Sequence, residues 1–591
     1  MKIKILSAFL ILTVLSGCIE DILDRQPLNM ISEADVWSSD KLVDIYLISL
    51  YDAIPIGFGR NSYIYEAHMT DESSHPYAGV TIVNNYGAQF LALNTGMYTW
   101  IRRANYFIEK IPQAQISEQR KTQLIAEARF LRAYYYLDLA KKYGGMPVID
   151  KVQTFEGDVE ELLTPRNTEE QTYDFILSEL DAAAAGLPDT RDAANSNRAV
   201  KLTAMALKSR AALYAGSIAK FGTVQLNGLV GIPASKANTY FNASMTAAKA
   251  IMDDGRFKLY TKAYDPASDA GDPAENYRLI FADKNNIEVI FQKAYNRPDK
   301  QHGYDNHNYP QSFKPGCCGN ALTPTLEMVE EYEYIDGTPG ALVIGGVEYD
   351  KPVDIFTNKD PRFFGTYMYP EHPYIGRPVQ IYRGIYDVDG TLYEAQGAPF
   401  PPDPSRNQVG RDGPHILGDV GKTGLYNKKY LNMTTIVAEN TSDQNYIDIR
   451  YAEILLNYSE AAFESNADLP GALNAINQIR DRAGIKLLDA ADLTRDKIRH
   501  ERKIELAFED KRFWDIRRWR IGTDLFRSTY VHGLWPYMKY YGGGVYKWIY
   551  VKKEGAPIDN GLARTWEEKD YYSNLSGYIS TNKNIINNPG W

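Results

Sequence analysis

The sequence predicts a mainly α protein, a scaffold of helices with long, irregular, loop-rich insertions and a few short strands. Two observations support this fold class. In residues 41–260 and again in 446–591, apolar residues recur at spacings of three and four, as they do on one face of a helix. Between these regions, residues 261–445 are rich in Gly, Pro, Asn, Asp and Tyr and have few long periodic runs. The chain has 591 residues, 44% of them hydrophobic, which is enough for a large buried core.

The strongest single element is a long helix that ends near residue 143. One apolar stripe runs along it and consists of Leu124, Ala128, Leu131, Tyr135 and Leu139. Gly144 and Gly145 then supply the left-handed conformation that ends many helices, and Pro147 cannot continue one. Because this stretch contains no catalytic motif, we interpret it as the spine of the helical scaffold.

Further helices follow from the same periodicity and from capping residues. In the N-terminal half they are predicted near 32–50, 97–111, 168–187, 198–219 and 236–253. In the C-terminal part they are predicted at 447–465 and between Pro470 and Gly484, since Pro favours the first turn of a helix and Gly its end. Glu288–Gln292 is one of the few strand-like pieces, and the tail from Ser528 is interpreted as an aromatic-rich loop.

The block from Ile498 to Trp519 is dense in Glu and Arg. Such a block can be an active site or an ion-pair network that locks helices together. We favour the network, because the block contains no recognisable catalytic spacing. Trp514 and Trp519 are expected to pack beside it.

Composition limits the classes of function. The formal net charge is -10, and no basic stripe interleaved with aromatic residues is present, which argues against nucleic-acid binding. The 44 tyrosines stand out. A tyrosine ring offers a flat apolar face and a hydroxyl, so it suits both helix packing and stacking on sugar rings. We expect packing to account for most of them.

No complete motif for a catalytic metal, a phosphate or a nucleophilic serine is present in the sequence. Asp387–Gly390 is too short for a helix-loop-helix calcium loop; a looser structural calcium site stays open there but is not predicted, and no cofactor is expected. Cys317 and Cys318 are adjacent, so a disulfide between them would be strained. We expect both to be free thiols in a turn.

The first residues resemble an export leader. Lys2 and Lys4 precede an apolar run, Ile5–Leu15, which is too short to span a bilayer. Leu15-Ser16-Gly17-Cys18 then matches a lipoprotein signal-peptidase site. The alternative is an ordinary secretory leader with a chance cysteine. In the lipoprotein interpretation, Cys18 becomes the mature N-terminus and carries the acyl chains that anchor the protein.

Several stretches, taken in order along the chain, resemble the SusD/RagB family, the surface glycan-binding lipoproteins of Bacteroidetes-type bacteria. They are IEDILDRQPLNM (19–30), EARFLRAYYYLDLAKKYGGMPVID (127–150), 276–291, 323–337, KDPRF (359–363), IDIRYAEILLNYSEAAFE (447–464), ALNAINQIRDRAG (472–484) and the 498–519 block. The resemblance implies tetratricopeptide-like helix pairs. It also implies a lipid-anchored protein, exposed on the outer membrane, that captures oligosaccharides and delivers them to a SusC-like TonB-dependent transporter.

The resemblance and the composition together suggest five segments. Residues 1–17 are a lipoprotein signal peptide, and 18–40 are a lipidated tether leading into the first helix. Residues 41–260 form an N-terminal SusD-like helical region, and 261–445 are a Tyr-rich, loop-rich region that contributes the ligand site. Residues 446–591 are the C-terminal RagB/SusD-like helical region and tail.

The family implies a glycan site built from loops beside the helical frame, rich in aromatic residues. Two loops of this chain fit, 71–90 and 295–320, because binding residues concentrate in irregular segments held on a rigid frame. The residues chosen as candidates are Asp71, His75, Tyr77, Tyr86, Tyr304, Asn306, His307 and Tyr309.

Two other functions are compatible with the sequence. One is a helical-repeat subunit of the transporter complex without a glycan site of its own. The other is a surface glycoside hydrolase, for which Asp71 and Glu72 could supply carboxylates. A hydrolase needs an acid and a second carboxylate on opposite sides of the bond, and the sequence does not identify the second. We therefore expect a binding protein rather than an enzyme.

Overall fold

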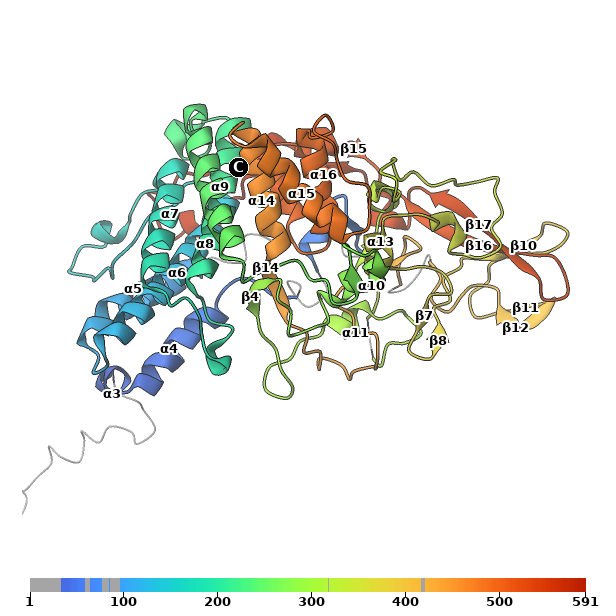
Figure 1. The fold of residues 1–591 in the computed structure, drawn as a ribbon, viewed down its shortest axis with the longest axis horizontal. Helices are drawn as coiled ribbons and strands as arrows, with labels where there is room; N and C mark the ends of the chain where they lie inside the picture. Colours follow the sequence, from blue (N-terminus) through green and yellow to red (C-terminus); the bar gives the residue numbers. More distant parts are fainter. Residues whose placement is uncertain (1–32, 59–63, 77–83, 85–95, 317, 416–419) are drawn as a thin grey trace, which may run out of the picture.

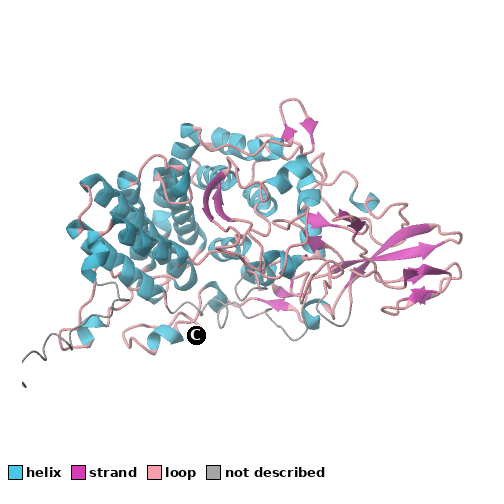
Figure 2. Ribbon diagram, turned by 90° about the horizontal axis from the view of Figure 1, so that it is seen from below, coloured by secondary structure: helices cyan, strands magenta, loops and turns pink. Residues whose placement is uncertain are grey.

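The computed structural model describes residues 33–58, 64–76, 84, 96–316, 318–415 and 420–591. Helices gather at one end of the molecule and short strands at the other, with long loops between them (Figure 1). The view from below shows the same division (Figure 2). The prediction of a mainly α fold with a few short strands is confirmed.

The helical end is a series of helices that pack against one another in turn. In chain order these are α6 (Glu118–Tyr143), α7 (Glu169–Gly186), α8 (Lys201–Phe221), α9 (Ala237–Asp254), α14 (Tyr451–Glu464) and α15 (Leu469–Arg482). On the outer side of α6 lie α4 (Asp40–Asp52) and α5 (Met97–Lys110). The helix predicted at 32–50 is divided at Ser39, which is extended and caps α4 by accepting a hydrogen bond from the Leu42 amide; the short α3 (Glu33–Ser38) precedes it.

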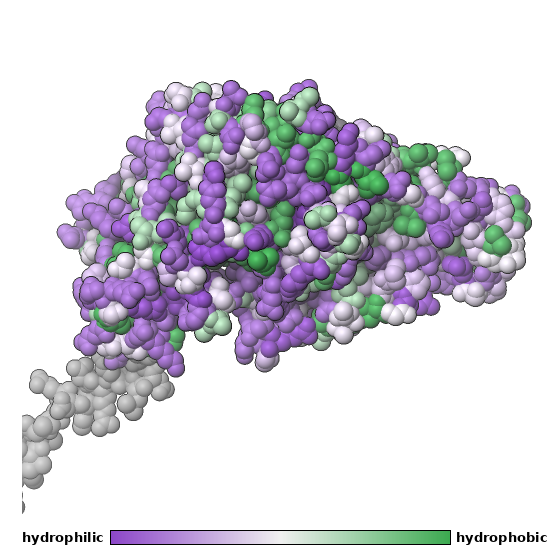
Figure 3. Space-filling model, in the orientation of Figure 1, coloured by the Kyte–Doolittle hydropathy of each residue, from purple (hydrophilic) through white to green (hydrophobic). Residues whose placement is uncertain are grey.

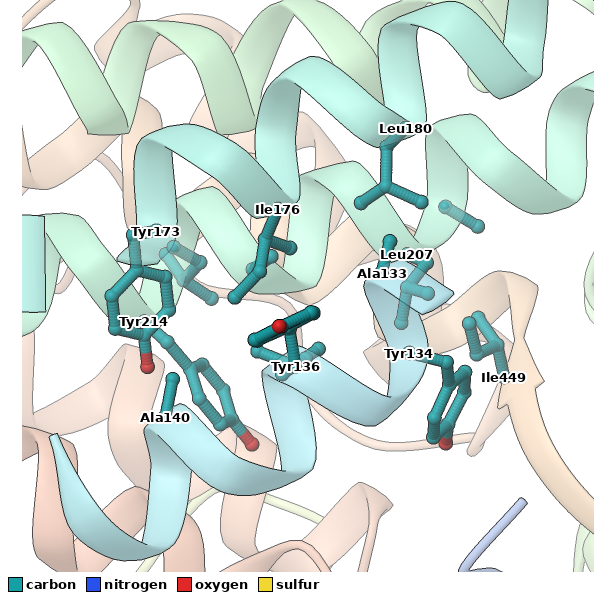
Figure 4. Packing of buried hydrophobic residues seen from close by; sticks show 14 of the residues in the cluster. Ala133, Tyr134, Tyr136, Ala140, Tyr173, Ile176, Leu180, Leu207, Tyr214 and Ile449 are labelled. Atoms are coloured by element: carbon teal, nitrogen blue, oxygen red, sulfur yellow. The ribbon is translucent and has the colours of Figure 1, made fainter. Parts of the chain in front are cut away.

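The predicted spine is α6. Ser117 caps its start by accepting from the Arg120 amide, and Gly144 ends it with φ 78°. All five residues of the predicted stripe are fully buried. Ala133, Tyr136 and Ala140 face α7 and α8, whereas Tyr134 lies on another side, near Ile449 (Figure 4). Because α6 is covered on several sides, charged residues such as Arg132 and Asp138 are buried on it as well, and each of these two is held in an ion pair.

The short strands tie distant segments together. β4 (Val289–Lys293) pairs antiparallel with β14 (Tyr446–Arg450), with Ile447 opposite Gln292. The predicted EVIFQ strand is therefore confirmed. The helix predicted at 447–465 is wrong at its start, because residues 446–450 belong to this strand and α14 begins only at Tyr451.

The prediction that the tail from Ser528 is a loop is wrong. Residues 533–553 form a long hairpin of β16 (Gly533–Tyr540) and β17 (Tyr546–Lys553), at the end of the molecule opposite the helices (Figure 1). β16 also pairs, in parallel, with β9 (Ile385–Tyr386), and β9 pairs with β10 (Leu392–Tyr393). The resulting four-stranded sheet has the order β10-β9-β16-β17.

The Glu- and Arg-rich block forms two helices, α16 (Arg495–Glu505) and α17 (Arg512–Trp519). Glu505, at the end of α16, accepts hydrogen bonds from three buried arginines: Arg450, Arg482 and Arg362. Arg450 also binds Glu288 at 2.7 Å and Glu509 at 2.8 Å. The predicted ion-pair network is confirmed.

The two tryptophans of the block also lie where they were expected. Trp519 Nε1 donates to Glu460 at 2.7 Å, and Trp514 Nε1 donates to Glu66 at the same distance. Both indole rings are buried. They pack beside the network and link it to the helical end.

The face shown in Figure 3 is mainly hydrophilic, with small hydrophobic patches between polar residues. Along the described residues, no helix combines the length and the apolar character that a membrane crossing needs.

Candidate functional site

The described start of the first predicted loop (71–90) pairs with residues just beyond the end of the second (295–320). Ser73–Ser74 (β1) pair with Thr323–Pro324 (β5), and His68 Nε2 lies 2.9 Å from the Ala321 carbonyl oxygen. The C-terminal part joins them. Ser74 Oγ donates to Asp559 at 2.8 Å, and Arg564 donates to the Ser73 carbonyl at 2.8 Å. Three segments far apart in the sequence therefore meet here.

The candidate side chains themselves are buried. The described ones, all at most 6% exposed, are Asp71, His75, Tyr304, Asn306, His307 and Tyr309. The Tyr304 hydroxyl donates to the Lys429 carbonyl at 2.6 Å, and the Tyr309 hydroxyl accepts from the Val437 amide at 2.8 Å. A ring without an exposed face cannot stack on a sugar, so in this structure these two tyrosines hold loops in place.

Asp71 and Glu72 are also held inside the protein. Arg512 binds both carboxylate oxygens of Asp71, at 2.8 and 2.9 Å, and Lys503 lies 2.8 Å away. Burial alone would raise the pKa of Asp71, but these two cations outweigh it and hold the pKa well below its usual range. Burial raises the pKa of Glu72 to about 8. An ionised and a protonated carboxyl side by side resemble a hydrolase pair, yet both are sealed from solvent and engaged by protein groups.

Tyr77, Tyr86 and Cys18 lie outside the described residues. Their predicted roles, glycan contact for the two tyrosines and lipidation for Cys18, stay predictions. Of the two adjacent cysteines, Cys317 is also outside the described residues, and Cys318 is half-buried.

The structure contains a cleft close to these loops, of about 330 Å³. It lies between α6, α8, β14 and α17, beside the end of the described segment 33–58. We call it the α6–α17 cleft. Its aromatic residues include Phe58, Tyr65, Tyr134, Tyr295, Tyr446 and Trp514. Its volume is at the small end of the range for ligand sites, roughly 300–1,000 Å³, so it suits one or a few sugar units rather than a long chain.

Half-buried aromatic rings stand on one side of the cleft. Phe58 follows α4, and Tyr295 follows β4. Between them lies His302, with ring centroids 4.4 Å from Phe58 and 4.6 Å from Tyr295. Phe58 also packs edge-on against Tyr446 at 5.3 Å. Rings supported in this way, with part of their surface exposed, can stack on the C–H face of a sugar.

The cleft is also lined by polar and charged residues. Asp448 of β14 accepts from Arg210 of α8 at 3.0 and 3.1 Å and from the Tyr134 hydroxyl at 2.7 Å. Although burial raises the pKa of Asp448, Arg210 and Lys511 outweigh it and lower the pKa to about 2. This carboxylate therefore stays ionised at neutral pH. A lining that combines aromatic rings with fixed polar groups suits sugar recognition.

Most residues of this cleft were not predicted from the sequence. Tyr295 lies at the first position of the loop chosen from sequence, but Phe58 and Tyr446 lie outside both loops. Trp514 was assigned to packing, although one of its edges lines the cleft. The density of aromatic residues around 58–65 and 295–309 was the only sequence signal for this place.

Within the described part of the chain, no group of three His, Cys, Asp or Glu side chains is arranged to hold a metal ion. The Asp387–Gly390 stretch is the tight turn between β9 and β10. The Asp387 amide donates to the Thr391 carbonyl at 2.9 Å, and Asp389 accepts from the Thr391 amide at 2.9 Å. These bonds explain the Asp-rich pattern as turn chemistry.

A frame of stacked helices that carries a small, aromatic and polar cleft defines a helical-repeat binding protein. Comparison with known proteins is consistent with this class. The SusD family model matches residues 287–591, and a model described as "Starch-binding associating with outer membrane" matches residues 21–213. The chain belongs to the SusD family, a carbohydrate-binding family associated with the outer membrane. The resemblance seen in the sequence is thus confirmed.

Individual relatives are distant but cover most of the chain. SusD-like protein P38 of Formosa agariphila is 24% identical over 539 residues, which are 86% of this chain and 89% of that protein. A SusD-like protein of Bacteroides fragilis has a TM-score of 0.70 at 26% identity, covering 96% of this chain and all of the other. A SusD-like carbohydrate binding protein of the same species has a TM-score of 0.66 at 23% identity, covering 93% and 100%. The last comparison bears on the fold alone.

Proposed function

We propose that this protein is a lipid-anchored, surface-exposed binding protein of the outer membrane that captures oligosaccharides and passes them to a SusC-like TonB-dependent transporter. The observation that carries the proposal is the α6–α17 cleft, where the half-buried rings of Phe58 and Tyr295 and fixed polar groups form one lining. Family membership supports carbohydrate as the ligand, and Cys18 supports lipid anchoring. The protein needs no catalytic group for this task, and we propose that it is not an enzyme.

Binding is tested with the protein purified without residues 1–18 on a broad glycan array, followed by calorimetry on each glycan retained. Phe58→Ala and Tyr295→Ala should each weaken binding by about 1–3 kcal/mol, because an aromatic anchor is lost. Tyr530→Ala is the control, since this tyrosine is 43% exposed and remote from the cleft lining. Unchanged affinity in both cleft variants would contradict the choice of site.

Two further measurements separate the alternatives. Release of reducing ends from a bound glycan would show an enzyme. If no glycan binds while the lipoprotein still co-purifies with the transporter, the protein is a scaffold subunit. Lipid anchoring is tested by Cys18→Ser, which should move the protein from the membrane fraction to the soluble fraction.

A further inference from the structure

The α6–α17 cleft contains one charged group that differs from the others. Lys141 lies in the last turn of α6, and its side chain lines the cleft. Its ammonium nitrogen sits 4.2 Å from the centroid of a Trp514 ring. Among the described residues, no carboxylate lies within ion-pair distance of it, and no oxygen accepts a hydrogen bond from it. An ammonium has three donors to satisfy.

The carboxylates that line the same cleft are already engaged. Asp138 accepts from Lys142 at 2.5 Å, and Glu66 accepts from Trp514 Nε1. Asp510 accepts from the Tyr446 hydroxyl at 2.9 Å. Asp448 is bound by Arg210, as described above, and lies 3.4 Å from Lys511. Asp138 and Asp448 thus pair with cations, and Glu66 and Asp510 accept from neutral donors. Lys141 is attracted by Asp138 and Glu66 but forms no ion pair with any described carboxylate.

A second cation lies behind Trp514. Arg517 of α17 is 3% exposed, and its guanidinium carbon is 5.7 Å from the centroid of a Trp514 ring. Its Nε donates to the Tyr571 carbonyl at 2.9 Å, while its two terminal nitrogens have no hydrogen-bond partner among the described residues. Arg517 lies outside the lining of the cleft, whereas Lys141 places an ammonium without an ion pair beside Trp514 within it. In a partly desolvated site, such charge attracts an anion much more strongly than it does in water.

We propose that the Trp514 end of the cleft binds the anionic substituent of an acidic oligosaccharide, a carboxylate or a sulfate ester, and that Lys141 is the residue that holds it. This inference rests on the proposed function and names the class of glycan that the same site takes. Sugar rings would then stack toward Phe58 and Tyr295, and the acidic group would lie against the ammonium. The small volume of the cleft means that one acidic unit, or the end of a chain, occupies it.

The protonation of Lys141 offers an independent readout. Burial lowers the pKa of Lys141 to about 8. The charged groups around its ammonium are Asp138 and Lys142 on its own helix, Glu66 of the 64–76 segment, Arg210 of α8 and Arg517 of α17. An anion bound beside the ammonium raises its pKa, so binding at pH 8 must take up a proton from the buffer. A neutral sugar at the same place takes up none.

The test uses matched pairs of ligands: a uronic-acid trisaccharide with its carboxyl-reduced form, and a sulfated disaccharide with its desulfated form. We expect the acidic member of one pair to bind about tenfold more tightly or better. The pair that shows the difference tells carboxylate from sulfate. Calorimetry in buffers of different ionisation enthalpy should show proton uptake at pH 8 for the acidic ligand alone.

Lys141→Met should abolish the difference within the pair, and Lys141→Arg should keep most of it because the charge remains. Lys258→Met, at an exposed lysine away from the cleft lining, is the matched control and should change neither affinity. Thermal melting establishes that each variant is folded; if Lys141→Met is not, Lys141→Arg and the proton uptake of the parent protein decide.

Three results are distinguishable. Equal affinity for both members of each pair, or a difference that survives Lys141→Met, overturns the inference and leaves glycan capture intact. Tight binding of neutral glycans in the cleft without proton uptake does the same. Failure to bind any glycan, acidic or neutral, instead overturns the proposed function.

Discussion

The helical end and the junction around Glu505 are equally buried but are held by opposite interactions. In the helical end, the core between α6, α7 and α8 consists mainly of Leu, Ile, Ala and Tyr side chains (Figure 4), with a single buried pair, Arg132–Glu179, joining α6 to α7 among the ion pairs of the described residues. Around Glu505, arginines and glutamates with no more than 2% of their side chains exposed lie in one network. Side-chain shape determines which residues fit the core of the helical end. Charge pairing determines which residues fit the junction around Glu505.

This difference teaches where the fold obtains its specificity. Apolar side chains of similar volume can replace one another at modest cost. A buried arginine has no such freedom, because it needs its own carboxylates at hydrogen-bond distance. Arg362, Arg450 and Arg482 come from three different segments and all bind Glu505. We infer that the network fixes how the loop-rich region and the C-terminal helices dock on each other.

The largest effect should follow removal of Glu505. Glu505→Ala leaves three buried guanidinium groups without a shared carboxylate, and we expect a loss of about 3–5 kcal/mol in the free energy of unfolding. Urea denaturation measures it. Asp253→Ala is the control, because its pair with Lys249 is exposed and should contribute less than about 1 kcal/mol. Similar losses in the two variants would remove the distinction between the buried network and a surface ion pair.

A core substitution in the helical end should lower the free energy of unfolding by a smaller or equal amount. Leu131 of α6 is fully buried, and Leu131→Ala should cost about 2–5 kcal/mol through lost burial and the cavity left behind. Leu487→Ala, at a leucine that is 46% exposed, is the matched control. The same urea experiment applies. If Leu131→Ala were much more damaging than Glu505→Ala, the apolar core and not the network would dominate stability.

The smallest expected effect is on how the stability of the protein depends on pH. The folded protein keeps a proton on Glu72 up to about pH 8, whereas the unfolded chain releases it near pH 4.5. Between these values, unfolding releases a proton, so the contribution of Glu72 to stability falls as pH rises. Glu72→Gln retains an oxygen that can accept from the Phe508 amide and should gain at least about 1 kcal/mol over the parent at pH 7, with little difference at pH 4. Denaturation at both pH values measures the gain; parallel stability curves would contradict it.

Much of the helical end could be predicted from the sequence, because period, caps and stops agree there. The stripe of α6 and its Gly144 stop are one case. The 446–450 strand could not be predicted from the sequence, because Ile447 continues the helical spacing of α14 while its backbone pairs with residues some 150 positions earlier. The β16–β17 hairpin was missed for a similar reason: Pro536 and the many aromatic residues hide its alternation. Pairing between distant segments leaves little trace in local sequence.

The candidate site divides in the same way. The sequence pointed to two loops, and residues that flank these loops, His68 and Ala321, make contact. It could not tell a tyrosine whose hydroxyl is satisfied inside the protein, such as Tyr304, from one whose ring lines a cleft, such as Tyr295. Both have the same side chain in an irregular segment. Only the neighbours in space decide between them.

The meeting of Ser74 with Asp559 has a consequence for biogenesis. The two residues are 485 positions apart, and Arg564 closes over Thr70 and Ser73 from the same C-terminal stretch. A polypeptide that emerges from a ribosome or a translocon with its N-terminus first must hold residues 70–74 without these partners until almost the whole chain is out. Chaperones that bind the emerging chain would meet residues 70–74 without these contacts throughout that time. Early termination a few dozen residues before the end would then leave residues 70–74 without their C-terminal partners, even if the helices had formed.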